Sequence, residues 1–226
     1  MARRSDWVCH FSASEIEEIQ NATATLANIS GDLAATGRDH FPLPRAGPRL
    51  HGWLDEVLNG RGFVLIRGLP VERWTERETA LAFLGIGHHL GNLRPQNAAG
   101  HLLGHVTDLG RSSLDPNARI YQTRERQTHH TDSCDVVALL CLRPARSGGL
   151  SSLVSSMTIF NEIRCRRPDL LIYCLSPSRR TVEAKCKWEA SPTLESPSST
   201  GMQVWFRRFI RGNISSRQGG LPMFSL

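Results

Sequence analysis

The chain has 226 residues, of which 40% are hydrophobic and 21% charged, a balance typical of globular proteins that excludes a wholly disordered or fibrous chain. Its formal net charge of +6 would suit an acidic partner such as nucleic acid, yet residues 172–226 carry a net charge of +5 and the preceding 171 residues only +1. No aromatic-basic module or helix-turn-helix pattern accompanies this charge, so we expect no nucleic-acid partner.

The sequence shows no targeting pattern. No apolar stretch approaches the roughly 18–20 residues that a membrane span needs, and the first residues lack the apolar segment of a secretory signal. The six cysteines form no C-x-x-C pair. We therefore expect a reduced, cytoplasmic protein with no membrane partner, and the sequence does not indicate its oligomeric state.

Four segments place apolar residues at helical spacing, which predicts four helices. The first helix begins with a capping box of Ser14 and Glu17. The third helix is bounded by Thr75 as its cap and Gly91 as its stop. The predicted helices span residues 14–36, 49–59, 75–90 and 157–164.

Strand predictions rest on short apolar or alternating runs. Residues 63–66 (FVLI) form a continuous apolar run closed by Gly68, which is typical of a short buried strand. A second strong strand is predicted over residues 135–142. Weaker candidates span residues 102–106 and 151–155.

The most informative short motif is the run THHTDS around His130 and Asp132. In a strand, residues two apart point to the same face, so this imidazole and this carboxylate would stand side by side, with His129 on the opposite face. They make up two of the three groups in a 2-His-1-carboxylate triad, the ligand set of non-haem ferrous oxygenases. Taken alone the spacing also fits a surface histidine beside a capping aspartate.

A set of longer motifs occurs in a fixed order around this one. The segments are 62–68 (GFVLIRG), 95–100 (PQNAAG), 130–137 (HTDSCDVV), 139–144 (LLCLRP), 148–156 (GGLSSLVSS) and 160–163 (FNEI). Together they resemble the taurine catabolism dioxygenase (TauD/TfdA-like) family, the clavaminate-synthase-like branch of the Fe(II)/2-oxoglutarate oxygenases. The resemblance covers about residues 7–171. It implies an α+β fold, in which a double-stranded β-helix (jelly roll) carries flanking helices.

The resemblance also implies roles for individual residues. His130 and Asp132 match the first two iron ligands of the family. Ser151 matches the hydroxyl that binds a carboxylate of 2-oxoglutarate, although an ordinary loop hydroxyl is the alternative. Gln96 and Asn97 lie where family members line the substrate entrance. The implied cofactors are Fe(II) and 2-oxoglutarate, and the implied partners are O₂ and a small-molecule substrate whose identity the sequence does not indicate.

The sequence departs from the family after Leu171. No histidine follows His130, although the family carries a second histidine ligand near the end of the fold and an arginine beyond it for 2-oxoglutarate. In residues 172–226 periodicity is poor and apolar residues are scattered among arginines. Read in a shifted frame, this tail can encode DRRGEV, WHAGL and YSRQYIES, which resemble family strings in the expected order.

These observations lead to a hypothesis about the chain. Residues 1–171 are the N-terminal part of a dioxygenase domain whose jelly roll is incomplete at the C-terminus, and residues 172–226 are an irregular, frame-shifted tail. We expect a longer enzyme cut short, inactive as written because the distal histidine and arginine are absent. The alternative is a non-enzymatic truncated remnant or binding module of the same fold.

Overall fold

Two compact units make up the described part of the chain. The computed structural model describes residues 7–29, 33–97, 99–112, 114, 118, 120–127, 129–130, 134–144 and 151–171. Of these residues, those up to Pro144 belong to the first unit and residues 151–171 to the second. The tail of residues 172–226, on which the frame-shift hypothesis falls, lies outside the described residues.

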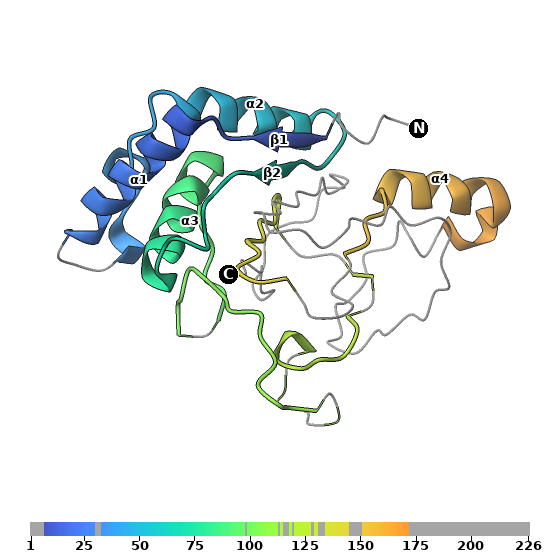
Figure 1. The fold of residues 1–226 in the computed structure, drawn as a ribbon. Coiled ribbons are helices and arrows are strands. Elements are labelled where there is room, and N and C mark those ends of the chain that lie inside the picture. Colours follow the sequence, from blue (N-terminus) through green and yellow to red (C-terminus); the bar gives the residue numbers. More distant parts are fainter. Residues whose placement is uncertain are drawn as a thin grey trace. The chain divides into compact units, whose positions relative to one another are not determined.

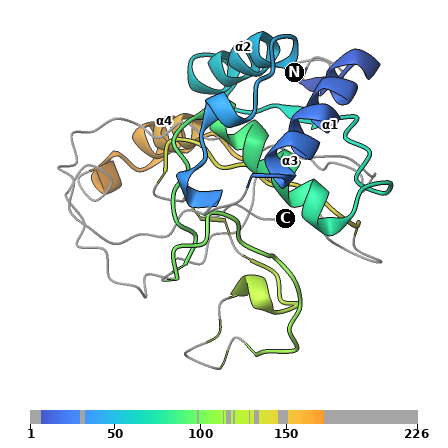
Figure 2. The ribbon, with the colours of Figure 1, turned by 90° about the vertical axis from the view of Figure 1, so that its left-hand side faces the viewer.

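The first unit opens on a parallel pair of strands, β1 (Val8–His10) and β2 (Leu65–Arg67), with Cys9 opposite Ile66. Parallel neighbours need a long crossover, which here is supplied by two helices, α1 (Ala13–Ala27) and α2 (Ala46–Leu58). A third helix, α3 (Glu76–Leu90), follows β2 and packs against α1 and α2, and it lies beside α1 in both views (Figures 1 and 2).

Short 3₁₀ turns complete this unit. They are η1 (Leu33–Ala35) and η2 (Arg38–His40) between α1 and α2, and η3 (Ile120–Gln122) within the long segment after α3. None of the helices in the described ranges combines the length and the apolar character that a membrane span requires.

The core of the first unit lies between α3, the two other helices and β2. Each element contributes an apolar face, as the helical and strand patterns predict. The largest fully buried side chains are Ile19, Leu26, Phe41, Leu50, Val57, Val64, Leu65, Ile66, Phe83 and Ile86.

The start of α1 differs from its prediction by two residues. Its cap is Ser12, whose backbone N–H donates to Glu15 Oε2 at 2.7 Å while its hydroxyl accepts from the Glu15 N–H at 3.4 Å. The expected box of Ser14 and Glu17 is therefore wrong. The reason is tertiary, because Glu15 is only 4% exposed and forms an ion pair with Arg49 of α2. The helix also ends at Ala27, well before the predicted residue 36.

The N-terminus of α2 has an acceptor supplied by another helix. The N-cap residue, Arg45, provides no capping side chain. Instead the Glu18 carboxylate of α1 accepts hydrogen bonds from the backbone N–H groups of Arg45, at 2.9 and 3.1 Å, and Ala46, at 2.8 Å. One side chain therefore satisfies two N–H groups that a helix start leaves without intrahelical partners.

We expect Glu18→Ala to lower the free energy of unfolding by about 1 kcal/mol, the usual cost of losing an N-cap acceptor. Glu17→Ala, at the exposed neighbouring position of the same helix, is the matched control and should change stability by less than about 0.5 kcal/mol. Urea unfolding of both variants measures the difference. Equal effects would show that the carboxylate of Glu18 does not cap α2.

The remaining helices follow their predictions. Helix α2 begins three residues before its predicted start. Helix α3 is capped by Thr75, whose hydroxyl accepts from the Glu78 N–H at 3.2 Å, and ends at Gly91. In the second unit, α4 (Ser156–Arg166) begins at the Ser155 cap and is followed by a 3₁₀ turn, η4 (Pro168–Leu170).

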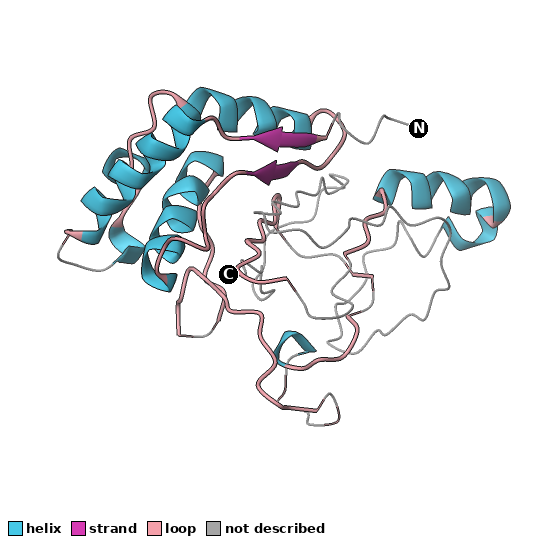
Figure 3. Ribbon diagram, in the orientation of Figure 1, coloured by secondary structure: helices cyan, strands magenta, loops and turns pink. Residues whose placement is uncertain are grey.

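The strand predictions are confirmed only in part. The run at residues 63–66 does contain a strand, β2, displaced toward Arg67. Residues 102–106 and 135–142 are not strands, and Gly104 and Leu139 are single bridge residues. Residues 151–155 are irregular as well. Among the described residues the only sheet is the β1–β2 pair, so these residues do not display the expected jelly roll (Figure 3).

Residues 136–142 nevertheless keep the burial pattern of a strand. Ala138 and Leu140 are 1% and 3% exposed and belong to the core, and Val136 and Leu142 pack against it from partly buried positions. The alternation with a period of two is that of an extended segment with one buried face. This segment begins three positions after the end of the THHTDS motif, and its buried face belongs to the core of the first unit.

Candidate functional site

His130 is the predicted metal ligand that the structure describes. Its side chain is exposed, and its Nε2 lies 3.1 Å from the side-chain amide nitrogen of Gln127. An amide nitrogen is only a donor, so in this arrangement Nε2 accepts and carries the lone pair that a metal ion needs. Gln127 was not among the residues predicted for the site, because a single glutamine before the motif forms no recognisable pattern.

The segment before the motif is held by hydrogen bonds of its own. Thr123 is 9% exposed; its hydroxyl donates to the Ile120 carbonyl at 2.8 Å and accepts from the Glu125 N–H at 3.1 Å. The backbone N–H of Thr107 donates to the Tyr121 carbonyl at 3.2 Å. These contacts hold residues 120–125 in place, and the buried face of residues 136–142 packs on the core of the first unit.

The described residues contain no second predicted iron ligand. Asp132 lies outside them, and Ser151 is a half-buried residue of the second unit. Within the described ranges, no three His, Cys, Asp or Glu side chains lie close enough to hold a metal ion. Imidazole and carboxylate groups together fit ferrous iron chemically. Of this pair, the described residues include only the imidazole of His130.

Cys141 does not extend this donor set. Its side chain lies in the segment after the motif, and burial raises the pKa of the thiol, against the smaller lowering effect of a hydrogen bond with the Arg143 backbone. A metal binds the thiolate form of cysteine, and burial disfavours that form. Carboxylate and imidazole groups therefore suit a ferrous site better than this thiol does.

Gln96 and Asn97 shape a tight loop after α3. Gln96 is 7% exposed and donates from its side-chain amide to the Arg94 carbonyl at 2.7 Å. The Asn97 side-chain oxygen accepts from the N–H groups of Ala99 and His101 at 3.1 and 3.2 Å, and its amide nitrogen lies 2.9 Å from His101 Nδ1. Both side chains therefore hold the loop, and their contact with a substrate stays a prediction.

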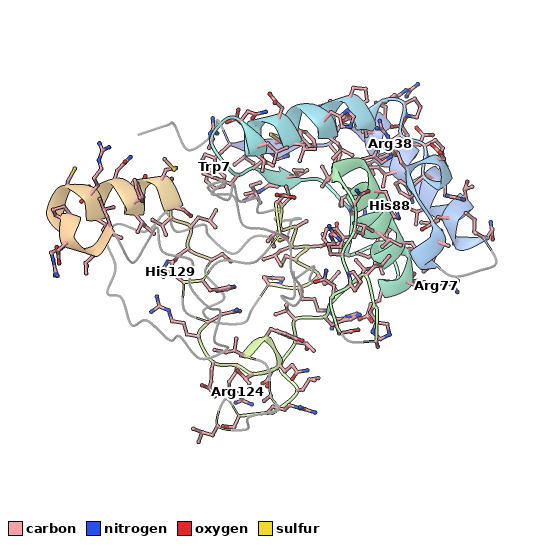
Figure 4. All side chains as sticks on the ribbon, turned by 180° about the vertical axis from the view of Figure 1, so that it is seen from behind. Trp7, Arg38, Arg77, His88, Arg124 and His129 are labelled. Atoms are coloured by element: carbon pink, nitrogen blue, oxygen red, sulfur yellow. The ribbon has the colours of Figure 1, made fainter. Side chains whose placement is uncertain are left out.

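The residue next to His130 provides a control for its predicted role as a metal ligand. His129 precedes His130 and is exposed as well; Figure 4 labels it in the segment before residues 134–144. The two imidazoles share their local sequence and exposure, but only His130 fits the H-x-D spacing. Variants at these two positions can therefore separate a specific ligand from a surface histidine.

Comparison with known proteins gives the site its context. The sequence profile described as "Taurine catabolism dioxygenase TauD, TfdA family" matches residues 25–208. The "FR-33289 synthase" of Streptomyces rubellomurinus is 35% identical over 135 residues, which cover 59% of this chain and 40% of that protein. The "Taurine hydroxylase-like protein SAT17" of Stachybotrys chartarum is 28% identical over 174 residues, 74% of this chain and 45% of that protein. The chain thus spans less than half the length of either relative.

Proposed function

The chain belongs to the taurine catabolism dioxygenase (TauD/TfdA) family, and from this membership we propose that it supplies the N-terminal part of an Fe(II)/2-oxoglutarate-dependent oxygenase acting on a small molecule. The observation that carries the proposal is the H-x-D pair of His130 and Asp132 inside the matched range. An isolated H-x-D pair would be weak evidence for an iron site. Here the pair lies within residues 25–208, which match the family, and this context strengthens it.

In this proposal each residue has a defined task. His130 and Asp132 would hold the iron, and the His130 Nε2 atom that accepts from the Gln127 amide would supply its lone pair. The hydroxyl of Ser151 would donate a hydrogen bond to a carboxylate of 2-oxoglutarate. When bound, iron and 2-oxoglutarate would supply the activation of O₂, and the protein would contribute ligand geometry, co-substrate binding and exclusion of water.

We propose further that the 226-residue chain by itself does not turn over. It carries no histidine after His130, so a third ligand of the facial triad is missing from this sequence. A second candidate function follows from the same observation. A chain that keeps the folded first unit and lacks the complete triad would act as a non-enzymatic remnant or binding module of this fold.

The tail decides between these candidates. The absence of histidine in residues 131–226 favours a change of reading frame near Leu171, while the family match that continues to residue 208 favours at least partial continuity in the present frame. Sequencing the transcript across residues 168–176 separates the two. A frame change at this point would restore the sequence of a complete enzyme. A transcript that matches the present frame throughout would exclude the frame change.

Turnover tests the function itself. With excess Fe(II), O₂ and 2-oxoglutarate, we expect the 226-residue chain to release no more succinate than its His130→Ala variant. If the transcript encodes a different continuation after Leu171, that product should release succinate and lose this activity on the same substitution. Succinate from the 226-residue chain above the variant's level would overturn the proposed inactivity, and a clean transcript without turnover would favour the remnant.

A further inference from the structure

A buried histidine outside the candidate site fastens the segment between α1 and α2 to α3. His89, near the end of α3, is 4% exposed, and its Nε2 lies 2.7 Å from the backbone carbonyl oxygen of Phe41. A carbonyl only accepts, so Nε2 donates and Nδ1 is the nitrogen without a proton. Within the described part of the chain, Nδ1 is buried and has no hydrogen-bond partner.

Phe41 is held on α3 at two points. Its carbonyl accepts from His89, and its ring, which is fully buried, lies against Gly85 one helical turn earlier. A Cβ atom built on Gly85 would lie 2.4 Å from that ring, so only glycine leaves room for it. We call this arrangement the Phe41 latch: the Phe41 ring on Gly85 and the Phe41 carbonyl on His89.

The unprotonated nitrogen of His89 faces α2. A Cβ atom built on Gly47 would lie 3.4 Å from Nδ1, and this nitrogen has no hydrogen-bond partner among the described residues. A proton added to Nδ1 would therefore face the backbone of α2 without an acceptor. Burying an unpaired donor, and with it a positive charge, is unfavourable in such a place.

The surrounding charges mostly oppose a positive charge on His89. Burial lowers the pKa of His89, and Arg38 of η2 and His51 of α2 lower it further, while the Phe41 carbonyl and Glu18 of α1 act in the opposite direction. Burial also lowers the pKa of His88, with smaller contributions from His89 and His40. Figure 4 labels Arg38 and His88 on this part of the first unit.

We propose that His89 is an acid-sensitive switch that releases residues 33–45 from α3 when it takes up a proton. Above pH 6.5 the neutral imidazole holds the Phe41 latch closed. In the open form His89 is in water and takes up a proton more readily, so the open form binds more protons than the closed form as the pH falls below 6.5. The opening equilibrium then rises by up to about tenfold per pH unit for the one proton involved.

Hydrogen exchange of the full 226-residue chain measures this opening. The amides of Phe41 and Gly47, which donate to the Arg38 and Leu43 carbonyls, report on the segment. Between pH 7.5 and 5.5, after correction for the intrinsic exchange rate, we expect their protection to fall by about tenfold. Protection that is unchanged down to pH 5.5 would overturn the proposal.

Two variants assign the effect to His89. His89→Gln keeps a side-chain N–H that can donate to the Phe41 carbonyl but does not titrate, and we expect it to remove the pH dependence. His51→Gln replaces an exposed histidine of the same neighbourhood and should retain it. A pH dependence that survives in His89→Gln and disappears in His88→Gln would assign the switch to the other histidine and contradict the proposal.

One measurement does not depend on the folding of any variant. Nuclear magnetic resonance of the ring nitrogens in the unmodified chain follows the tautomer and the titration of His89 directly. We expect the Nε2–H tautomer at pH 7.5 and a midpoint below 6.5. The Nδ1–H tautomer, or a midpoint above 6.5, would refute the switch.

Discussion

Replacing Gly85 by alanine is expected to lower the free energy of unfolding of the first unit by about 1–3 kcal/mol, the usual cost of overpacking a core. An alanine inside a helix normally stabilises it relative to glycine, by about 1 kcal/mol. Here the added Cβ would lie 2.4 Å from the ring of Phe41, which is fully buried and cannot turn into solvent without leaving the core. The steric cost therefore reverses the sign of the helix preference.

Gly52→Ala is the matched control for this prediction. Gly52 lies within α2, is exposed, and has no atom within 4 Å of a Cβ built on it. Its replacement should raise stability by about 0.5–1 kcal/mol, because only the backbone preference is changed. Urea unfolding monitored by tryptophan fluorescence compares the two variants. A stabilising effect of both substitutions would show that Phe41 does not pack on Gly85.

The helices were the most predictable part of the fold. Their signals are local, since apolar spacing and a capping residue lie within a few positions of each other. Thr75 and Gly91 bound α3 as predicted. The predicted start of α1 was wrong because Glu15 forms an ion pair with Arg49 of α2. These two residues lie 34 positions apart, so no local pattern contains the contact.

The strands were less predictable because a strand is completed by its neighbours. Two residues of the predicted strand at 63–66, Leu65 and Ile66, pair with β1 and form β2 together with Arg67, whereas residues 135–142 keep only the alternating burial of a strand. The buried face is encoded locally by alternation, but the ladder of hydrogen bonds depends on residues far along the chain. The sequence pattern therefore located the extended segment correctly and overstated its hydrogen bonding.

The candidate site was also predictable only where its signal is local in the sequence. The motif identified His130 through spacing and family resemblance. It did not identify Gln127, whose amide approaches His130 Nε2, because a single glutamine carries no periodic signal. The role of His89 was not predicted for a related reason. In the sequence it is one more polar residue near a helix end, and only the packing of Phe41 and Gly47 around it shows that its ring is enclosed.

Removing the imidazole of His130 should produce the largest functional change. We expect His130→Ala to weaken the binding of Mn(II) or Co(II), used as stable substitutes for Fe(II), by at least about tenfold, the lower end of what losing a group behind a metal ligand costs. The reason is that the proposed site of the 226-residue chain has only two protein ligands, so one substitution removes half of them. Calorimetric titration under anaerobic conditions measures the affinity.

His129→Ala is the control, since it removes an exposed imidazole one residue away without altering the H-x-D spacing. It should leave the affinity unchanged within about twofold, because a histidine outside the ligand set contributes no bond to the metal. Equal losses in both variants would mean that metal binds to surface histidines in general. A loss confined to His130→Ala, and repeated by Asp132→Asn, would place imidazole and carboxylate on one ion, the arrangement from which the family chemistry begins.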